Sequence, residues 1–280
     1  MPLLGLGTYQ IRDRDTIFQV VDAALAVGYR LIDTAAGYGN EQYIGEALHA
    51  LLPKHGLSRQ QILLTSKLAP KDHGLSNAPA AVQKSLQNLK QNYLDLYLIH
   101  WPGVQGIPVD DVKNSQLRAE SWTVLENFNR AGALRTIGVS NYTIKHVTEL
   151  LQHCCIKPSV NQCEYHPHFV DRQLTRLCSE NDIHFQAYSS LGSPAYRHRL
   201  FAEKLLEKLS SKYNCTIAQL LLAWSMHQGI SVLPRTTSTE RVAENFGAVH
   251  VALDRKDVEA ISDLSQQTFT KYCWDPRTVC

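Results

Sequence analysis

The sequence predicts a closed α/β barrel, a (β/α)8 fold in which eight parallel strands alternate with helices over residues 1–280. Two observations predict it. Short apolar runs alternate with longer amphipathic segments along the chain, which indicates a parallel sheet joined by crossover helices. The apolar runs contain few polar residues, as expected for strands buried on both faces. Barrels of this class commonly fill about 250 residues as a single domain, so the length fits one domain.

Eight segments have the length and composition of buried strands. An open sheet that binds a dinucleotide would require the G-x-G-x-x-G fingerprint after its first strand, and Gly5-Leu6-Gly7 supplies only the first half. Eight strand–helix units therefore favour a closed barrel. The expected strands are Leu3–Gly7, Arg30–Thr34, Ile62–Lys67, Leu94–His100, Thr136–Ser140, Ser159–Glu164, His184–Ser189 and Ser231–Pro234.

Helices are expected where apolar residues recur with the helical period between these strands. Gly28 lies where the carboxyl-terminal cap of the first helix belongs, and Pro53 is expected to stop the second. The expected helices are Asp15–Val27, Glu41–Leu52, Ala80–Leu89, Ala119–Ala131, Ile144–Gln152, Arg172–Glu180, Phe201–Tyr213, Ile217–His227, Arg241–Glu244 and Asp254–Leu264.

Composition argues against several classes of partner. The chain has 28 Lys and Arg residues against 26 Asp and Glu, and a formal net charge of +2 with no basic block argues against nucleic acid. Its 7 cysteines are odd in number and form no C-x-x-C pair, which is typical of free thiols in a reducing compartment. We find neither a signal-peptide pattern nor an apolar run of about 18 residues. We expect a cytoplasmic monomer that binds no membrane and acts on a small molecule.

Four polar side chains end or follow successive apolar strands, where barrel enzymes place their active sites. They are Asp33, Tyr38, Lys67 and His100. A buried carboxylate such as Asp33 needs a cationic partner, because burying an unpaired charge is costly. Each residue alone has an ordinary structural explanation, as a cap, an edge charge, a packing ring or a hydrogen-bonded imidazole. Their convergence on one rim favours catalysis.

The chain resembles the aldo-keto reductase family over essentially its whole length. One such motif would be weak evidence, but seven in the family's order with fitting spacing are specific. The segments that carry the resemblance are Leu31–Glu41, Thr65–Lys67, Leu98–Pro102, Ile137–Asn141, Asn161–Pro167, Ala187–Ser189, and Pro234–Thr236 with Glu240–Asn245.

The resemblance implies a catalytic tetrad at Asp33, Tyr38, Lys67 and His100. Tyr38 would give a proton to the carbonyl oxygen as a hydride reaches the carbonyl carbon. An ordinary phenol titrates near about pH 10, so we expect the neighbouring ammonium of Lys67 to lower the pKa of Tyr38. Asp33 would hold Lys67 in place and keep it charged. His100 would aim the carbonyl group and stabilise its developing charge.

NADPH is the cofactor that the resemblance implies. Its phosphates would lie after the seventh and eighth strands, where barrels often bind phosphate, and guanidinium groups would hold the 2′-phosphate. The implied contacts are Thr8, Asp33, Ser140, Asn141 and Gln162 around the nicotinamide, with Tyr188 stacked on its ring; Ser189, Leu191 and Ser193 along the pyrophosphate; Arg235, Thr236 and Arg241 at the 2′-phosphate; and Glu244 and Asn245 at the adenine.

The sequence departs from the family pattern at four places. Arg235 stands where Lys is usual, Thr236 where Ser is usual, and Ser190 where Pro is common. The first two replacements keep the charge and the hydroxyl, so the preference for NADPH is expected to survive. The chain also begins at the first barrel strand, so we expect it to lack the usual N-terminal hairpin that covers the barrel floor.

Two short segments bear on the substrate. The loop Gly192–Arg199 is short compared with mammalian members that resemble aldose reductase, and the short tail Tyr272–Cys280 resembles that of broad-specificity members. Both predict broad substrate choice, because fewer contacts are fixed. The expected substrate contacts are Tyr9, Tyr38, His100 and Trp101, with Trp274 as a further aromatic wall.

The expected function is NADPH-dependent reduction of aldehydes and ketones to alcohols. One alternative is a non-catalytic family member that binds NADPH, resembling a lens crystallin or a redox-sensing regulatory subunit. A second is a phosphate-handling barrel enzyme such as an isomerase, which would share only the fold. The second explains a phosphate-binding rim but gives no role to Tyr38 beside Lys67.

Overall fold

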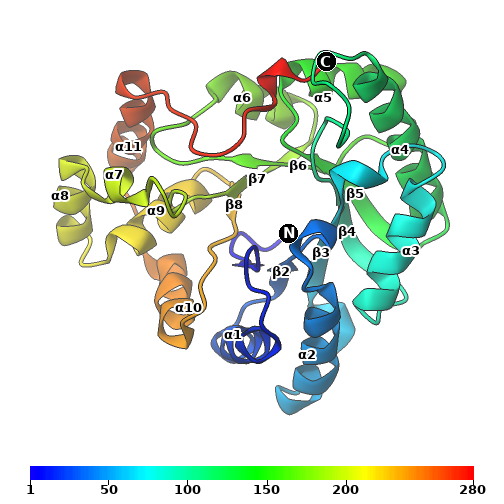
Figure 1. Cartoon of the computed structure of the whole chain (residues 1–280). Coiled ribbons are helices and arrows are strands. Elements are labelled where there is room, and N and C mark those ends of the chain that lie inside the picture. Colours follow the sequence, from blue (N-terminus) through cyan, green and yellow to red (C-terminus); the bar gives the residue numbers. More distant parts are fainter.

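The computed structural model describes residues 1–280, and its centre is one parallel sheet of eight strands in the order of the sequence. Helices surround the sheet on the outside (Figure 1). This confirms the predicted (β/α)8 fold. The strands are β1 (Leu6–Gly7), β2 (Leu31–Asp33), β3 (Leu63–Leu68), β4 (Leu94–Ile99), β5 (Leu134–Ser140), β6 (Val160–Glu164), β7 (His184–Tyr188) and β8 (Ser231–Val232).

The first and last strands meet through β1 and the segment that precedes it. Gly5 N donates to Val232 O at 2.9 Å, and Gly7 N donates to Pro234 O at 3.1 Å. A Cβ at Gly7 would lie 2.6 Å from the carbonyl oxygen of Leu233, so only glycine allows this approach. The expected strand Leu3–Gly7 is therefore shorter than predicted, because its first half bridges β8 instead of pairing with β2.

The helices follow the predicted order and enclose the sheet. Asp13 caps the first helix by accepting from Thr16 N at 2.8 Å, and Gly28 ends it at φ 114°. The helices are α1 (Arg14–Val27), α2 (Glu41–Lys54), α3 (Ala78–Asn88), α4 (Lys113–Arg130), α5 (Ile144–His153), α6 (Arg172–Glu180), α7 (Arg197–Phe201), α8 (Lys204–Lys212), α9 (Ile217–Met226), α10 (Thr239–Phe246) and α11 (Arg255–Gln267). Short 3-10 turns are η1 (Ala36–Tyr38), η2 (Arg59–Gln61), η3 (Pro70–Asp72), η4 (Gly247–His250) and η5 (Pro276–Thr278).

Several predicted helix boundaries are wrong. The helix α4 begins at Lys113 and not at Ala119, since buried Asn114 donates to the carbonyls of Pro108 at 2.7 Å and Asp111 at 3.0 Å and stabilises a polar first turn. The expected helix 201–213 is divided between the end of α7 and the whole of α8. The short helix α7 itself was not predicted, and α2 and α10 are longer than expected.

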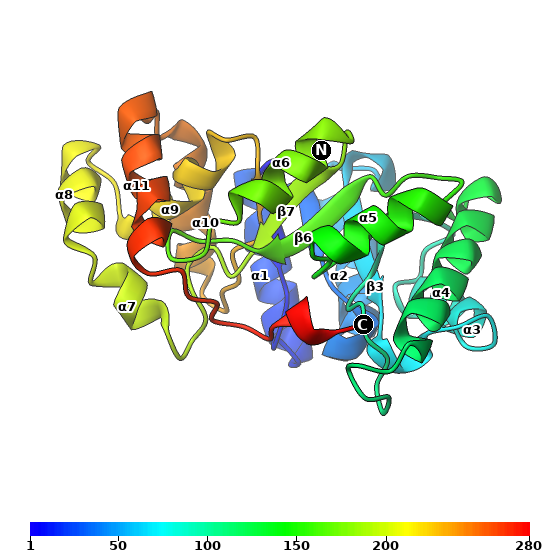
Figure 2. The same ribbon diagram turned by 90° about the horizontal axis from the view of Figure 1, so that it is seen from above.

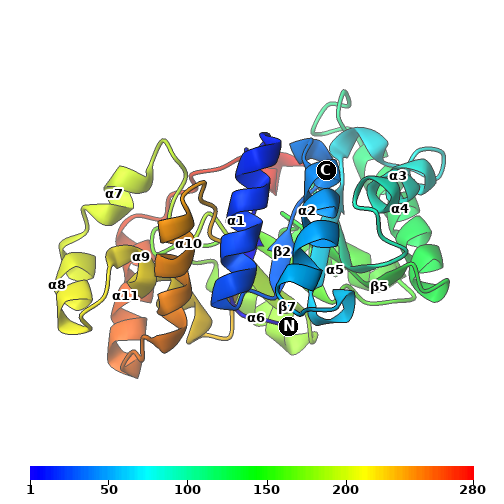
Figure 3. The ribbon, with the colours of Figure 1, turned by 90° about the horizontal axis from the view of Figure 1, so that it is seen from below.

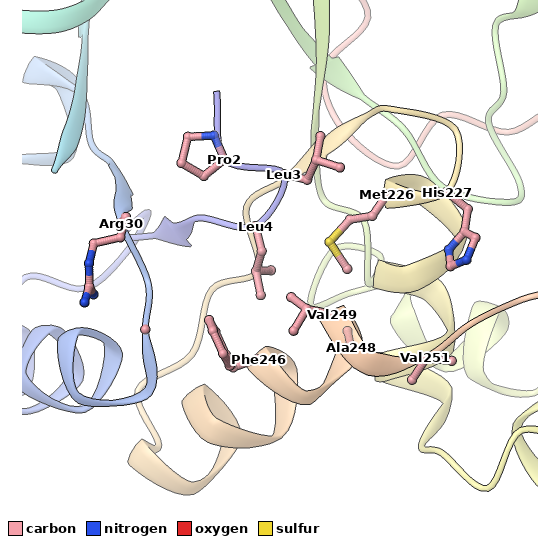
Figure 4. Close-up of a pocket in the computed structure, with 11 residues that line it drawn as sticks. Pro2, Leu3, Leu4, Arg30, Met226, His227, Phe246, Ala248, Val249 and Val251 are labelled. Atoms are coloured by element: carbon pink, nitrogen blue, oxygen red, sulfur yellow. The ribbon is translucent and has the colours of Figure 1, made fainter. Parts of the chain in front are cut away.

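The amino end of the barrel contains an apolar cavity. Figure 3 shows α10, α1 and α2 as neighbouring outer helices, with the N-terminus and C-terminus toward opposite ends of the molecule. A cavity of about 590 Å³ lies at the amino ends of β1, β2 and β8, next to the N-terminal segment (Figure 4). Its wall is mainly apolar and contains none of the predicted site residues. The lining residues include Leu3, Leu4, Met226, Phe246 and Val249.

None of the helices combines the length and the apolar character needed to cross a membrane. The seven cysteines are unpaired.

Candidate active site

Lys67 lies at the centre of the candidate active site, at the carboxyl end of β3. Its Nζ atom donates to Asp33 Oδ1 at 2.6 Å, to Thr34 O at 2.9 Å and to Tyr38 Oη at 3.2 Å. Lys67 is fully buried and Asp33 is 4% exposed. All three N–H donors of the ammonium group are thus used by acceptors in β2 and in the turn that follows it. The structure brings together the carboxylate, amine and phenol that the sequence analysis selected.

Tyr38 is held in place by its neighbours. It ends the 3-10 turn η1, and its ring lies 5.1 Å from the ring of Tyr9 and 5.5 Å from that of His100, centroid to centroid. Asn40, two residues after Tyr38, connects this turn to a neighbouring loop. Its Nδ2 donates to Thr8 O at 2.9 Å and Ile11 O at 2.8 Å, which joins the loop after β1 to the turn that carries Tyr38.

The expected lowering of the Tyr38 pKa is wrong for the free protein. Burial raises the pKa of Tyr38 well above its ordinary value, and the Asp33 carboxylate and Tyr9 act in the same direction. Burial lowers the pKa of Lys67, while Asp33 opposes that shift. The phenol therefore stays protonated, and Lys67 Nζ is the group that can stabilise a phenolate once the proton has left.

His100 follows β4 on the same rim. Burial and the nearby charge of Lys67 lower the pKa of His100 to about 3, so its imidazole is neutral at ordinary pH. Its backbone carbonyl accepts from Asn141 Nδ2 at 3.0 Å, which ties the ends of β4 and β5 together. A neutral imidazole beside a protonated phenol gives the rim two neutral hydrogen-bond donors close to one point.

The residues expected around the nicotinamide form one hydrogen-bonded group. Asn141, at φ 64°, accepts from Tyr188 Oη at 2.6 Å, and Ser140 Oγ donates to Gln162 O at 2.8 Å. Gln162 Nε2 donates to Asp33 Oδ2 at 2.8 Å, which links this group to the candidate tetrad. The side chains come from the ends of β5, β6 and β7, which meet at one edge of the barrel.

Gln186 on β7 was not singled out in the sequence. It is fully buried, and its Oε1 accepts from Gln162 Nε2 at 2.8 Å. Both hydrogens of the Gln162 side-chain amide are thereby engaged, one by Gln186 and one by Asp33, so the side-chain oxygen Oε1 of Gln162 is left to accept from a ligand. A polar residue in the interior of a strand, two positions before Tyr188, is the sequence signal for it.

The loop after β7 contains hydroxyl groups that have no partner within the chain. Ser190 Oγ and Ser193 Oγ are buried and have no hydrogen-bond partner in the chain. Leaving a buried hydroxyl unpaired costs about 1–3 kcal/mol, so such groups are expected to have a ligand. Ser189, at φ 52°, places its Oγ 3.3 Å from Cys273 Sγ, and Leu191 packs against the core. Ser190 had been noted only as a departure from the family pattern.

The groups expected at the 2′-phosphate and adenine lie after β8 and on α10. Arg235 donates through Nε to Tyr9 O at 2.9 Å and through Nη2 to Gln10 O at 3.2 Å, so it joins the loops after β8 and β1. Arg241 is exposed in the first turn of α10 and makes no side-chain hydrogen bond. Thr236 is buried between them, and Asn245 is buried on the helix beside the half-exposed Glu244.

The substrate side of the rim is partly open. Tyr9 is 46% exposed and Trp101 is partly buried after β4. Trp274 is 76% exposed and does not line the cavity beside Tyr38, so its place in an aromatic wall stays a prediction. A cavity of about 500 Å³ lies next to Tyr38, and its lining residues are Arg12, Ala36, Gly37, Tyr38, Gly39, Ala69, Pro70, Lys71 and Gln105.

Glu164, at the end of β6, anchors the C-terminal tail. Although it is buried, hydrogen bonds from His166 and the charge of Lys271 lower the pKa of Glu164 to about 2. Its carboxylate accepts from Lys271 Nζ at 2.7 Å and from Cys273 N at 3.1 Å. Figure 2 shows the tail running from α11 across the molecule toward α5. The sequence motif contains Glu164, but nothing in the sequence indicates its partner 107 positions away.

Known proteins resemble this chain over most of its length. The model of the Aldo/keto reductase family matches residues 3–266. The chain is 35% identical over 266 residues to glyoxal reductase from Bacillus subtilis, covering 95% of this chain and 90% of that protein.

Solved structures agree. An aldo-keto reductase from a Medee basin deep-sea metagenome library superposes with a TM-score of 0.88 at 32% identity, covering 98% of this chain and 94% of that one. An aldo-keto reductase from Bombyx mori, solved in complex with NADP, gives a TM-score of 0.86 at 29% identity, with coverages of 94% and 89%. The chain therefore belongs to the aldo/keto reductase family.

Proposed function

We propose that this protein reduces aldehydes and ketones to alcohols with NADPH, with Tyr38 as the proton donor. The observation that carries the proposal is the contact of Lys67 Nζ with both the Asp33 carboxylate, at 2.6 Å, and the Tyr38 hydroxyl, at 3.2 Å. The membership of the family and the resemblance to a glyoxal reductase support carbonyl reduction.

Tyr38 transfers its proton to the carbonyl oxygen of the substrate. The raised pKa of Tyr38 keeps the phenol protonated before reaction, so the donor is fully loaded at neutral pH. As the proton leaves, the phenolate accepts more strongly from Lys67 Nζ, and this charge-assisted hydrogen bond stabilises the product side of the step. Asp33 keeps the ammonium aimed at Tyr38.

His100 orients the substrate. Because its pKa is lowered to about 3, the neutral imidazole can donate one hydrogen bond to the carbonyl oxygen without giving up a proton. Tyr38 and His100 then approach the same oxygen, which places the carbonyl carbon toward the residues that would hold the nicotinamide.

We assign the residues that hold the cofactor from the family resemblance and from the polar atoms of the site that have no partner in the chain. NADPH, when bound, supplies the hydride that reaches the carbonyl carbon. The side-chain oxygen Oε1 of Gln162 and the side chains of Ser140 and Asn141 would hold its carboxamide, and Tyr188 would pack on the ring. The unpartnered hydroxyls of Ser190 and Ser193 suit the pyrophosphate, which adds Ser190 to the expected set.

The experiment is a measurement of NADPH consumption by absorbance with a panel of small aldehydes and ketones. Wild-type protein should oxidise NADPH only when a carbonyl compound is present, with an alcohol formed in equal amount. Tight binding of NADPH without turnover of any member of the panel would favour the non-catalytic alternative and contradict the proposal.

A further inference from the structure

The cavity beside Tyr38 has a positively charged wall. It is bounded by the loops after β1, β2, β3 and β4, and its two ionisable residues other than Tyr38 are Arg12 and Lys71. No acidic residue lines it. Because Tyr38 itself lines this cavity, the cavity is the space that we assign to the rest of a substrate whose carbonyl oxygen reaches the Tyr38 hydroxyl.

Neither Arg12 nor Lys71 has an ion-pair partner in the chain. By contrast, Arg14, two positions after Arg12, pairs with Asp15 at 3.6 Å and with Glu46 at 2.9 Å. Both side chains are exposed. Two unpaired cations that face one cavity favour the binding of an anion there.

The acidic neighbours of these cations have other roles. Asp13, next to Arg12, caps α1 by accepting from Thr16 N at 2.8 Å and from Thr16 Oγ1 at 2.7 Å. Asp72, next to Lys71, is half-buried and does not line the cavity; burial raises its pKa, the charge of Lys71 opposes that shift, and the two side chains form no ion pair. Neither carboxylate therefore occupies the space that Arg12 and Lys71 border.

The wall that carries Lys71 is fixed to its neighbour. Gln105 N donates to Pro70 O at 3.1 Å, which connects the loop after β4 to the turn η3 that bears Lys71. Gln105 also lines the cavity and adds an amide that can donate to an oxygen anion. The cationic groups are thus presented from two loops held by the barrel rim.

We propose that this site prefers carbonyl substrates that carry a carboxylate, with the carbonyl at Tyr38 and the carboxylate between Arg12 and Lys71. A guanidinium matches the two oxygens of a carboxylate, and the ammonium adds a second charge. The proposal rests on the proposed reductase activity and adds the chemical class of the substrate.

The test compares matched aldehydes that differ in charge. We would measure kcat/KM with NADPH for para-carboxybenzaldehyde against para-methylbenzaldehyde, and for succinic semialdehyde against pentanal. Wild-type protein should favour the carboxylate in at least one pair. The preference should weaken between about 0.05 and 0.5 M salt, because salt screens partly exposed charges.

The variants are Arg12→Gln, Lys71→Gln and the double replacement. Each single change should lower kcat/KM for the carboxylate about two- to fivefold, as expected for partly exposed ion pairs, and the double change about tenfold. Turnover of the neutral aldehydes and the KM for NADPH should stay constant. Lys84→Gln is the matched control, because Lys84 is exposed on α3, forms no ion pair and lies outside the cavity. Lys71→Arg keeps the positive charge and should therefore keep the wild-type preference for the carboxylate substrate.

Several results would overturn the inference. Equal kcat/KM for charged and neutral aldehydes in wild-type protein would do so, as would variants that lose both classes alike. A rise in the KM for NADPH would show that the two cations serve the cofactor. Failure to reduce even the neutral aldehydes would instead contradict the proposed function, so the two failures are distinguishable.

Discussion

At the scale of single residues, Lys67 connects the groups of the site. It is buried and pairs with Asp33, and the only other side-chain donor to that carboxylate is Gln162. Replacing Lys67 by Met keeps the apolar stem but leaves a buried carboxylate without its cation. Loss of one partner of such a pair typically costs about 3–5 kcal/mol.

We therefore expect Lys67→Met to lower the free energy of unfolding by about that amount and to abolish most turnover. Urea unfolding and steady-state rates measure the two effects. Lys84→Met, which removes an exposed amine from α3, is the control and should change neither. Wild-type stability and rate in the Lys67 variant would remove Lys67 from the mechanism.

The lowered pKa of His100 leads to a prediction about how kcat/KM depends on pH. Because its pKa is lowered to about 3, His100 stays neutral as the pH falls from about 8 to 5, and Tyr38 stays protonated because its pKa is raised. Neither group should therefore add an inflection to the profile of kcat/KM for reduction in that range. An inflection near about pH 6.5 that disappears in His100→Gln would mean that His100 titrates as an ordinary imidazole.

The residues of the tetrad could be selected from the sequence because strand ends are local features and the barrel places them on one rim. The sign of the Tyr38 pKa shift could not. It depends on how far the ring is buried between Tyr9 and His100, and those neighbours come from different loops. Gln186 was missed for a similar reason, since its partner Gln162 lies on another strand.

At the scale of elements, the first turn of α10 bears on which arginine contacts the 2′-phosphate of the cofactor. Arg241 is exposed in its first turn with no intramolecular partner, whereas Arg235 is already held by two carbonyls of the loop after β1. Arg241 should thus be the freer of the two to contact a 2′-phosphate.

Wild-type protein should bind NADPH at least about tenfold more tightly than NADH, and Arg241→Gln should reduce that ratio without weakening NADH. Fluorescence titration with both cofactors measures it. Arg255→Gln at the start of α11, whose pair with Glu259 is exposed, is the control. Equal dissociation constants for the two cofactors in wild-type protein would contradict the assignment of the phosphate site.

Element boundaries were predictable where an end signal is present in the sequence and not elsewhere. Gly28 ends α1 as expected, because a left-handed conformation at that position favours glycine. The start of α4 was missed, since Asn114 stabilises it by hydrogen bonds to a preceding loop and apolar periodicity does not extend there. Long-range contacts decide such ends.

At the scale of the whole molecule, buried histidines contribute to the response of stability to acid. Burial lowers the pKa of His73 and His146 to about 4 and that of His100 to about 3. The unfolded chain binds these protons near about pH 6.5, before the folded chain does. The stability that these neutral buried rings contribute is therefore fully present above about pH 6.5 and is lost as the pH falls toward 4.

Each such histidine should remove about 1.4 kcal/mol of unfolding free energy per pH unit within this window. Urea titrations at several pH values between about 7 and 4.5 measure the slope. His146→Gln should reduce the slope, whereas His49→Gln, which removes an exposed imidazole from α2, should leave it unchanged. A stability that is independent of pH in this window would contradict the burial of these rings.

The barrel itself was predictable from the sequence because alternating strand and helix patterns admit few arrangements. The closure of β1 on β8 through the segment around Gly5 and the path of the tail over the rim were not predictable. Both depend on contacts between residues more than a hundred positions apart, such as Glu164 with Lys271.

The most direct test of the proton-donor role is the rate of hydride transfer in Tyr38→Phe. The variant keeps the ring and removes only the hydroxyl that Lys67 contacts, so NADPH should still bind with nearly wild-type affinity. Single-turnover oxidation of bound NADPH by a good aldehyde should slow by about 10²–10⁴-fold, while Tyr43→Phe on α2 should react like wild type. A Tyr38→Phe rate within about twofold of wild type would contradict the mechanism, although the fold and the cofactor site would stand.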